Sequence, residues 1–280
     1  MPEISTLIKK RVSCRTYADK PLDEEILQDF TALVAAEHTG TFGNKPDFRL
    51  INLDMSTPAE WKNLGTYGVI KNARLYLSGK IKKGDKAIVD YGYCMETLIL
   101  QATALGLGTC WLAGTFNASG FAKAVNRSDD ELLPAISPIG YPADQKSFLE
   151  KTFRRFAGSN FRKPWMEIFF AGNFTTPLTP VQAGKYAEAL ENVRLAPSAS
   201  NKQPWRIVLD TAGNSFHFYL DRAFGYNLRE VPIQDLDVGI AMNHFECTAK
   251  EMGITGNWKI SENSPQTNSL DYIVSWQENI

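Results

Sequence analysis

Two arginines near the N-terminus have a spacing that suits the binding of an anion. Arg11 and Arg15 flank Ser13, each two residues away from it. A guanidinium group presents its N–H donors as a planar fork, which matches the oxygen atoms of a phosphate group. In an extended segment, the two arginines can contact different parts of one ligand. A solvated basic turn would account for the same residues, and the sequence alone leaves both interpretations open.

A second polar segment, PSASN from Pro197 to Asn201, lies far along the chain. Proline lacks an N–H donor, and serine and asparagine bond to nearby backbone, so this segment is predicted to be a loop. The amide of Asn201 offers a donor and an acceptor together, which suits a ring edge with alternating polar groups. An ordinary turn after a helix is the alternative interpretation.

A third segment, GLGTCWLAG from Gly106 to Gly114, follows a predicted helix. Gly114 allows the backbone to approach a ligand closely, and a backbone N–H at this point could donate a hydrogen bond. Gly106 could simply be the residue that ends the helix. The segment lacks the fingerprint G-x-G-x-x-G, which argues against a separate dinucleotide-binding domain.

Other kinds of chemistry have little support in the sequence. The four cysteines form no CxxC pair and the three histidines no HExxH motif, so we expect no metal site. A net charge of −1 gives no basic excess for nucleic acid or a membrane surface. Without a signal peptide or an apolar run of spanning length, a cytoplasmic protein with reduced thiols is expected. The 280 residues, 44% of them hydrophobic, suffice for a substantial core.

Two long segments that resemble each other must position these candidate residues. DYGYCMETLILQATALGLGTCW begins at Asp90, and DVGIAMNHFECTAKEMGITGNW begins 147 residues later, at Asp237. Apolar residues recur at helical spacing in the first copy. Each segment is therefore predicted to be a helix that starts near its aspartate and ends at Gly106 or Gly253.

A further pair of similar segments precedes these helices. GNKPDFRLINLD (43–54) resembles SNKQPWRIVLD (200–210), and in each half a helix is predicted before the segment, after Pro21 and after Pro177. The predicted strands are 48–53, 75–78, 205–209 and 216–220, and 272–276 could form an edge strand. The common order indicates an internal duplication, with a first half at 1–165 and a shortened second half at 166–280, packed as one globular unit.

The two halves differ at the candidate segments. The basic segment at 11–15 corresponds in the second half to residues 167–171, which contain no base. The segment from Ala196 to Trp205, which contains the loop at 197–201, corresponds in the first half to Thr39–Phe48, which has lost the Pro, the Ser and the Gln-Pro-Trp. Each half therefore keeps what the other lacks.

Four motifs, taken in order, resemble the nitroreductase family of FMN-dependent oxidoreductases. They are RVSCR, GLGTCW followed by Leu112-Ala113-Gly114, SPIGYP and PSASNKQPW. The stretches RKPWMEIFF and DLDVGIAMNHF are similar to a branch in which one polypeptide mimics the usual homodimer. The resemblance implies an α+β fold, in which a mixed sheet is flanked by helices and two unequal repeats form an intramolecular pseudo-dimer.

The resemblance also implies the binding residues of the cofactor. In this family, FMN takes its phosphate contacts from the basic N-terminal motif of one subunit and part of its ring contacts from the PSxxN loop of the other. The residues implied here are Arg11, Ser13, Arg15, Ala113, Gly114, Arg162, Lys163, Pro197, Ser198, Ala199 and Asn201. The reciprocal pocket would lack both its basic motif and its loop, so we predict one FMN per chain.

Individual roles follow from the same resemblance. Arg15 would stabilise the reduced ring, and a backbone N–H at Gly114 would lie near flavin N5. Arg162 and Lys163 resemble a second phosphate-binding stretch, in which Asn160 replaces a common lysine and which Arg154 and Arg155 could supplement. A basic solvated loop is the alternative for these four cations.

The implied activity is that of an oxidoreductase in which NAD(P)H reduces FMN and a small acceptor, such as a nitroaromatic or a quinone, reoxidises it. Hydride transfer at the flavin depends on stacking and orientation, so no catalytic acid–base pair is expected. Flavin fragmentation or dehalogenation on the same fold, an FMN-binding protein with little turnover, and a scaffold that binds no flavin stay open as alternatives.

Overall fold

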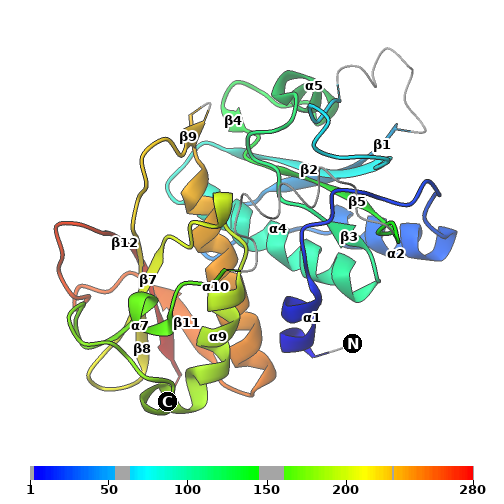
Figure 1. Ribbon diagram of the computed structural model, residues 1–280. Helices are drawn as coiled ribbons and strands as arrows, with labels where there is room; N and C mark the ends of the chain where they lie inside the picture. The colour runs from blue at the N-terminus through cyan, green and yellow to red at the C-terminus, as the bar shows by residue number, and fades with distance from the viewer. Residues whose placement is uncertain (1–2, 54–63, 145–160, 229, 280) are drawn as a thin grey trace.

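Two long helices cross at the centre of the molecule and separate two β-sheets (Figure 1). The helices are α4 (Ala87–Ala104) and α10 (Ile233–Glu251), which pack directly against each other. The computed structural model describes residues 3–53, 64–144, 161–228 and 230–279. Its mixture of sheets and helices confirms the predicted α+β class.

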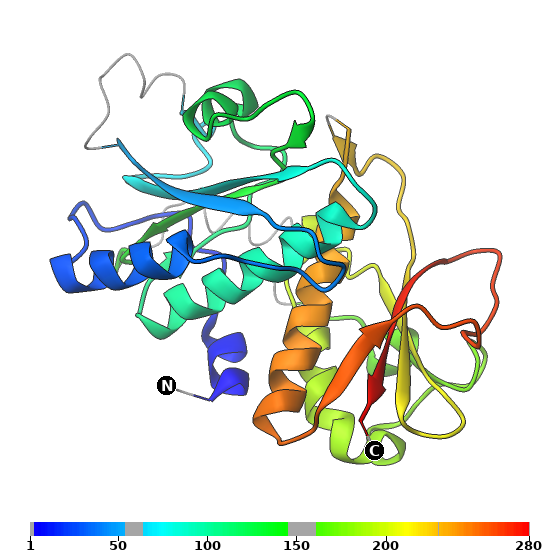
Figure 2. The same ribbon diagram turned by 180° about the vertical axis from the view of Figure 1, so that it is seen from behind.

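The first sheet is built from the first half of the chain, and its strands pair antiparallel throughout the described residues. Its order is β1 (Asp47–Asn52), β2 (Leu75–Lys82), β5 (Ile136–Gly140) and β3 (Gly108–Thr109), and β4 (Glu131–Leu132) pairs with β2. Helices α2 (Glu24–Ala35) and α4 cover one face (Figure 2). The predicted strands at 48–53 and 75–78 are thereby confirmed.

The second sheet has the order β11 (Gly256–Lys259), β12 (Asp271–Glu278), β8 (Ser215–Leu220), β7 (Trp205–Leu209) and β6 (Phe169–Ala171). Only the pairing of β6 with β7 is parallel among the described strands. The predicted strand at 272–276 exists as part of β12. Its suggested edge position is wrong, because β11 pairs with its outer side.

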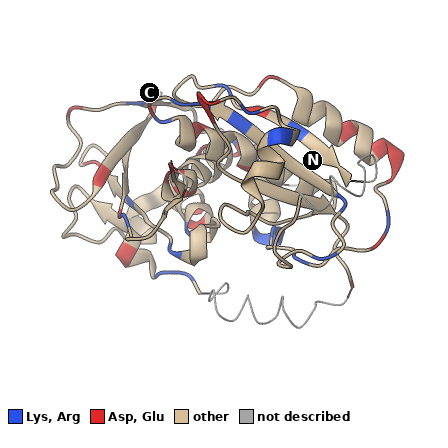
Figure 3. Cartoon of the chain, turned by 90° about the horizontal axis from the view of Figure 1, so that it is seen from above, with Lys and Arg blue, Asp and Glu red and all other residues tan. Residues whose placement is uncertain are grey.

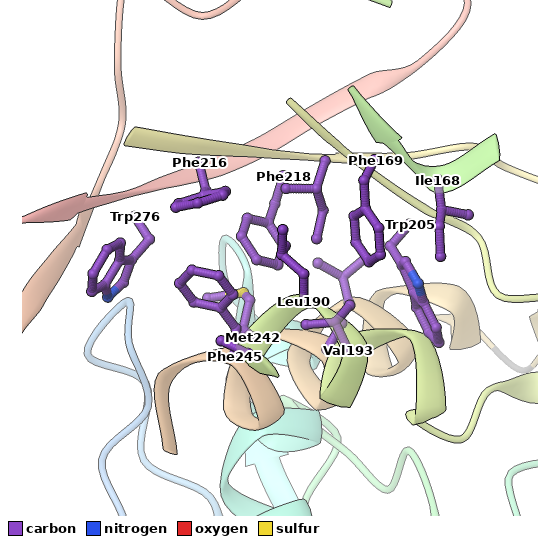
Figure 4. Packing of buried hydrophobic residues seen from close by; sticks show 14 of the residues in the cluster. Ile168, Phe169, Leu190, Val193, Trp205, Phe216, Phe218, Met242, Phe245 and Trp276 are labelled. Carbon is purple, nitrogen blue, oxygen red and sulfur yellow. The ribbon is translucent and has the colours of Figure 1, made fainter. Parts of the chain in front are cut away.

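Aromatic side chains fill the space between the second sheet and its helices. Figure 4 shows Phe216, Phe218 and Trp276 of the sheet facing Met242 and Phe245 of α10. The ring centroids of Phe216 and Phe245 lie 4.9 Å apart. Helix α9 (Ala187–Leu195) adds a second row of apolar contacts to this core. Burial of such large rings supplies most of the stability of a layer of this kind.

The remaining elements are short. They are α1 (Ile4–Lys10), α5 (Ala118–Ala124), α7 (Trp165–Ile168), α8 (Pro180–Ala183), η2 (Gly184–Tyr186), η3 (Ala199–Asn201), β9 (Asn227–Leu228) and β10 (Val231–Pro232). Although α1 belongs to the first half in sequence, it packs against α9 and α10 as well as α4. The two halves are therefore interlocked at the N-terminus.

The long helices end where the sequence predicts but begin earlier. Gly106 and Gly253 follow them with φ of +79° and +75°, the left-handed conformation that glycine adopts without strain. Both aspartates predicted near the helix starts lie further inside, since α4 begins at Ala87 and α10 at Ile233. Their carboxylates instead accept hydrogen bonds from loops, as described below.

Two glycines allow the central helices to approach backbone to backbone. A Cβ atom on Gly92 would lie 2.4 Å from the carbonyl oxygen of Leu236, and one on Gly239 would lie 2.0 Å from that of Val89. Gly92 and Gly239 are equivalent in the repeat, as are Val89 and Leu236. The crossing is therefore reciprocal, which supports the proposed duplication.

This close approach predicts the outcome of replacing Gly239 with alanine. In an isolated helix, Gly→Ala stabilises by about 1 kcal/mol. Here the added methyl group overpacks the crossing, so we expect a net loss of about 2 kcal/mol in the free energy of unfolding. Urea denaturation measures it. A Gly239→Ala variant more stable than the parent would contradict the crossing geometry.

Candidate functional site

A cavity of about 790 Å³ lies between the two halves of the chain. The sequence-predicted residues that line it are Arg11, Ser13, Arg15, Ala113, Gly114, Arg162, Pro197, Ser198, Ala199 and Asn201. Lys163 is not among the lining residues. The cavity therefore brings together segments from the front, the middle and the rear of the sequence.

The N-terminal segment enters the cavity in an extended conformation. After α1 ends at Lys10, Ser13 forms a β-bridge with Thr109, and the backbone N–H of Cys14 donates to the Thr109 carbonyl at 2.8 Å. Alternate side chains of an extended segment point to opposite sides. Cys14 is accordingly buried in the core of the first half, and Arg11, Ser13 and Arg15 all line the cavity.

Arginine side chains concentrate positive charge at one end of the cavity. The side chain of Arg11 is buried, with 8% exposure, and its Nε and Nη1 have no hydrogen-bond partner within the described part of the chain. Burial lowers the pKa of Arg162, and the nearby charges of Arg11 and Arg194 lower it further. Elsewhere, Lys and Arg are interspersed with Asp and Glu over both halves (Figure 3). An anion bound here would relieve the repulsion between these cations and use the N–H groups of Arg11.

The loop at 197–201 forms the opposite wall. The hydrogen bonds that hold it include those from Ala199 N to Asp237 Oδ1 at 2.9 Å and from Gln203 N to Ser198 Oγ at 2.8 Å. Asn201 has φ of +54°, a conformation that asparagine tolerates better than most residues. Its amide donates to Phe161 O at 2.9 Å and accepts from Arg162 Nη1 at 3.2 Å. Asn201 therefore links this wall to the cationic end.

The segment after β3 supplies a tightly fitted third wall. Leu112 and Ile136 exchange two backbone hydrogen bonds of 2.9 Å, which fix the chain where it begins to line the cavity. A Cβ atom on Gly114 would lie 3.0 Å from Leu228 Cδ1. Glycine at this position therefore lets the backbone pack closely against Leu228, another residue of the cavity lining.

Several lining residues were not singled out from the sequence as ligand contacts. They include Trp111, Tyr226, Leu228 and Asp237. The identity of Asp90 and Asp237 in the two similar segments is the one sequence signal for Asp237, but it predicts a helix start and not a ligand contact. No local pattern indicates Tyr226, which directly precedes the short strand β9, or Leu228, which belongs to it.

Lys163, Arg154 and Arg155 are also candidates for phosphate binding, but none of them is a described residue of the cavity lining. The backbone N–H of Lys163 donates to Gln203 Oε1 at 2.8 Å, and burial together with the charge of Arg206 lowers the pKa of its side chain. Lys163 therefore lies behind the loop at 197–201, apart from the cavity lining. Arg154 and Arg155 lie outside the described residues.

Comparison with known proteins identifies the family. The sequence family described as "Putative TM nitroreductase" matches residues 3–249. The chain belongs to this family. A solved structure of a nitroreductase-family protein from Thermotoga maritima covers 98% of this chain and 93% of its own length, with a TM-score of 0.61 and 21% identity. A "Putative NADH dehydrogenase/NAD(P)H nitroreductase" from Archaeoglobus fulgidus is 25% identical over 177 residues, which are 59% of this chain and 100% of that protein.

Family membership places the protein among nitroreductase-family oxidoreductases and confirms the resemblance drawn from its motifs. The fold of the Thermotoga protein extends over nearly the whole chain, as expected for a nitroreductase-like α+β architecture. No helix in the described ranges is long and apolar enough to cross a membrane. Within the same ranges, no group of three or more His, Cys, Asp or Glu side chains could hold a metal ion.

Proposed function

We propose that the cavity binds one FMN and that the protein is an NAD(P)H-dependent flavin oxidoreductase. The observation that carries this proposal is the buried guanidinium of Arg11, whose Nε and Nη1 lack partners among the described residues at the edge of a cavity of about 790 Å³. A buried cation without a partner is costly, so this arrangement fits a ligand that brings a dianionic phosphate.

The residues present fit the rest of the cofactor as well. Arg11, Ser13 and Arg162 would hold the phosphate end. Arg15, the backbone at Ala113 and Gly114, and the loop at 197–201 would hold the ring. All of these line one continuous cavity, as an elongated ligand requires. FMN, when bound, would supply hydride transfer between NAD(P)H and a small acceptor.

The residues of the chain would bind and orient the cofactor and the acceptor, and they would exclude water from the cavity. The planar guanidinium group of Arg15 would favour a reduced, anionic ring. Apolar and aromatic side chains, among them Trp111, Tyr226 and Leu228, line the same cavity and favour a flat acceptor such as a quinone or a nitroaromatic. No acid–base side chain is required for this transfer.

The loop of the first half that corresponds to 197–201 supports the proposal of a single cofactor per chain. Phe42 stands where the second half has Ala199, and its backbone N–H donates to Asp90 Oδ1 at 3.0 Å, as that of Ala199 does to Asp237. The side chain of Phe42 packs against the core of the second half. A bulky ring therefore stands at the position where the proposed site has a small methyl group.

Titration of apoprotein with FMN tests the cofactor and its stoichiometry. We expect quenching of flavin fluorescence to saturate at one FMN per chain, and the purified complex to be yellow. Two equivalent sites would contradict the single-site proposal, and the absence of any binding would contradict the flavin assignment itself.

The activity is tested by anaerobic reduction of the bound flavin and by steady-state assays. Addition of NADH or NADPH should bleach the flavin absorbance, and a quinone or a nitroaromatic should restore it. Flavin that binds but is not reduced by either nucleotide would favour another chemistry on the same fold or a binding protein with little turnover.

A further inference from the structure

Asp90 and Asp237 occupy equivalent positions on α4 and α10 and brace equivalent loops. Phe42 N donates to Asp90 Oδ1 at 3.0 Å, and Ala199 N donates to Asp237 Oδ1 at 2.9 Å. The surroundings of the Asp90 carboxyl group can therefore be compared directly with those of the Asp237 carboxyl group.

The second oxygen of each carboxyl group has a different environment. Asp90 Oδ2 accepts from the backbone N–H of Asn44 at 3.0 Å and from its side-chain amide at 2.9 Å. Asp237 Oδ2 has no hydrogen-bond partner among the described residues, although Asp237 is only 3% exposed. Asn201, the equivalent of Asn44, directs its amide to Phe161 instead. The carboxyl group is thus saturated in one half and open in the other.

The open carboxyl group belongs to the wall of the cavity, together with Leu236 and Ile240 of the same helix. Burial raises the pKa of Asp237 well above its ordinary value, and the nearby charge of Asp235 adds to this effect. Since Oδ1 already accepts from Ala199, a proton on this group would reside on Oδ2. A protonated Oδ2 would offer the cavity an O–H donor among apolar neighbours, where a hydrogen bond is stronger than in water.

We propose that Asp237 contacts the molecule bound in the cavity directly, donating a hydrogen bond from Oδ2 to an acceptor oxygen or nitrogen of a conjugated ring system. This inference rests on the proposed function, because both FMN and a quinone or nitroaromatic carry such atoms. It adds to the site a residue from the rear helix that no motif places there. Asp237 is thus a binding residue, and Asp90 its structural counterpart.

The test uses the full-length protein with Asp237→Asn, Asp237→Ala and the matched control Asp90→Asn. Asparagine can keep the bond to Ala199 through Oδ1, while its amide is a weaker donor than a carboxylic acid. Hydrogen exchange of the loop at 197–201 checks that this bond persists. The readouts are the FMN dissociation constant, the absorption maximum of bound flavin and the KM for 1,4-benzoquinone.

If FMN is the partner, Asp237→Asn should shift the absorption maximum and weaken FMN binding about threefold, and Asp237→Ala about tenfold. If the electron acceptor is the partner, the KM for 1,4-benzoquinone should rise about threefold in Asp237→Asn and about tenfold in Asp237→Ala, while the affinity for FMN stays constant. Asp90→Asn should alter none of these values.

The inference would be overturned by an Asp237→Asn variant in which the loop at 197–201 stays protected from hydrogen exchange and all three readouts keep their parental values. A role of Asp237 that is limited to holding this loop predicts that result. Parental protein that binds no FMN would instead contradict the proposed function, and this inference with it. The two failures are therefore distinguishable in the first titration.

Discussion

Replacing Arg11 with alanine is expected to weaken FMN binding about a hundredfold. The side chain is 8% exposed, and two of its nitrogen atoms lack a partner within the described residues. Hydrogen bonds from a charged donor contribute about 1.5–3 kcal/mol each, and about 2.7 kcal/mol corresponds to a hundredfold change in the dissociation constant. Fluorescence titration of the apoprotein measures this loss.

The stability of the apoprotein separates lost binding from lost folding. Because an unpaired buried cation is costly, Arg11→Ala apoprotein should be at least as stable as the parent. Arg11→Lys should bind with intermediate affinity, since it keeps a charge but loses the planar fork. Arg49 on β1, whose ion pair with Asp47 is exposed, is the matched control, and Arg49→Ala should bind FMN normally. Unchanged affinity in Arg11→Ala would place the phosphate elsewhere.

Much of the scaffold could be predicted because its signals are local. The helical period of the segment after Asp90, the glycines at 106 and 253, and the short apolar runs at 75–78, 205–209 and 216–220 each specify one element through neighbouring residues. Repetition of the same order in both halves of the sequence strengthens each prediction. The division at residue 165 itself stays a prediction.

The departures from prediction have nonlocal causes. Asp90 resembles a helix-capping residue, but its carboxylate is occupied by the loop at 42–44, so α4 begins a turn earlier. Strand β11, only four residues long, gives too weak a pattern to be predicted, and it converts β12 from an edge strand into an inner one. Lys163 differs from Arg162 because its backbone is held by Gln203, a contact that no spacing encodes.

The cavity shows the same division between local and nonlocal information. Motifs predicted ten of its lining residues, since each motif is a continuous segment with distinctive residue types. Tyr226 and Leu228 reach it through the β9–β10 hairpin, which is too short to carry a periodic signal. Polar side chains with atoms that find no partner among the described residues, such as Asp237, can be recognised only once burial is known.

A buried pair across the central helices is the clearest case of a contact that sequence spacing does not reveal. Glu96 of α4 and His244 of α10 are both fully buried, and His244 Nε2 lies 2.9 Å from Glu96 Oε1. Trp111, which lines the cavity, donates from Nε1 to Glu96 Oε2 at 2.8 Å. His244 Nδ1 lies 2.9 Å from the carbonyl of Asn192, which can only accept, so Nδ1 carries a proton.

We therefore expect His244→Leu to lower the free energy of unfolding by about 3–5 kcal/mol, because it leaves a buried carboxyl group without its partner. Glu96→Gln should cost far less, about 1 kcal/mol, because its amide can donate to His244 Nε2 while its oxygen still accepts from Trp111. Urea denaturation of the apoprotein measures both. Equal losses in the two variants would contradict this hydrogen-bond arrangement, since only the leucine variant leaves a buried polar atom unsatisfied. The same pair joins the two halves beside the cavity, so its loss in His244→Leu should also loosen the wall that Trp111 forms.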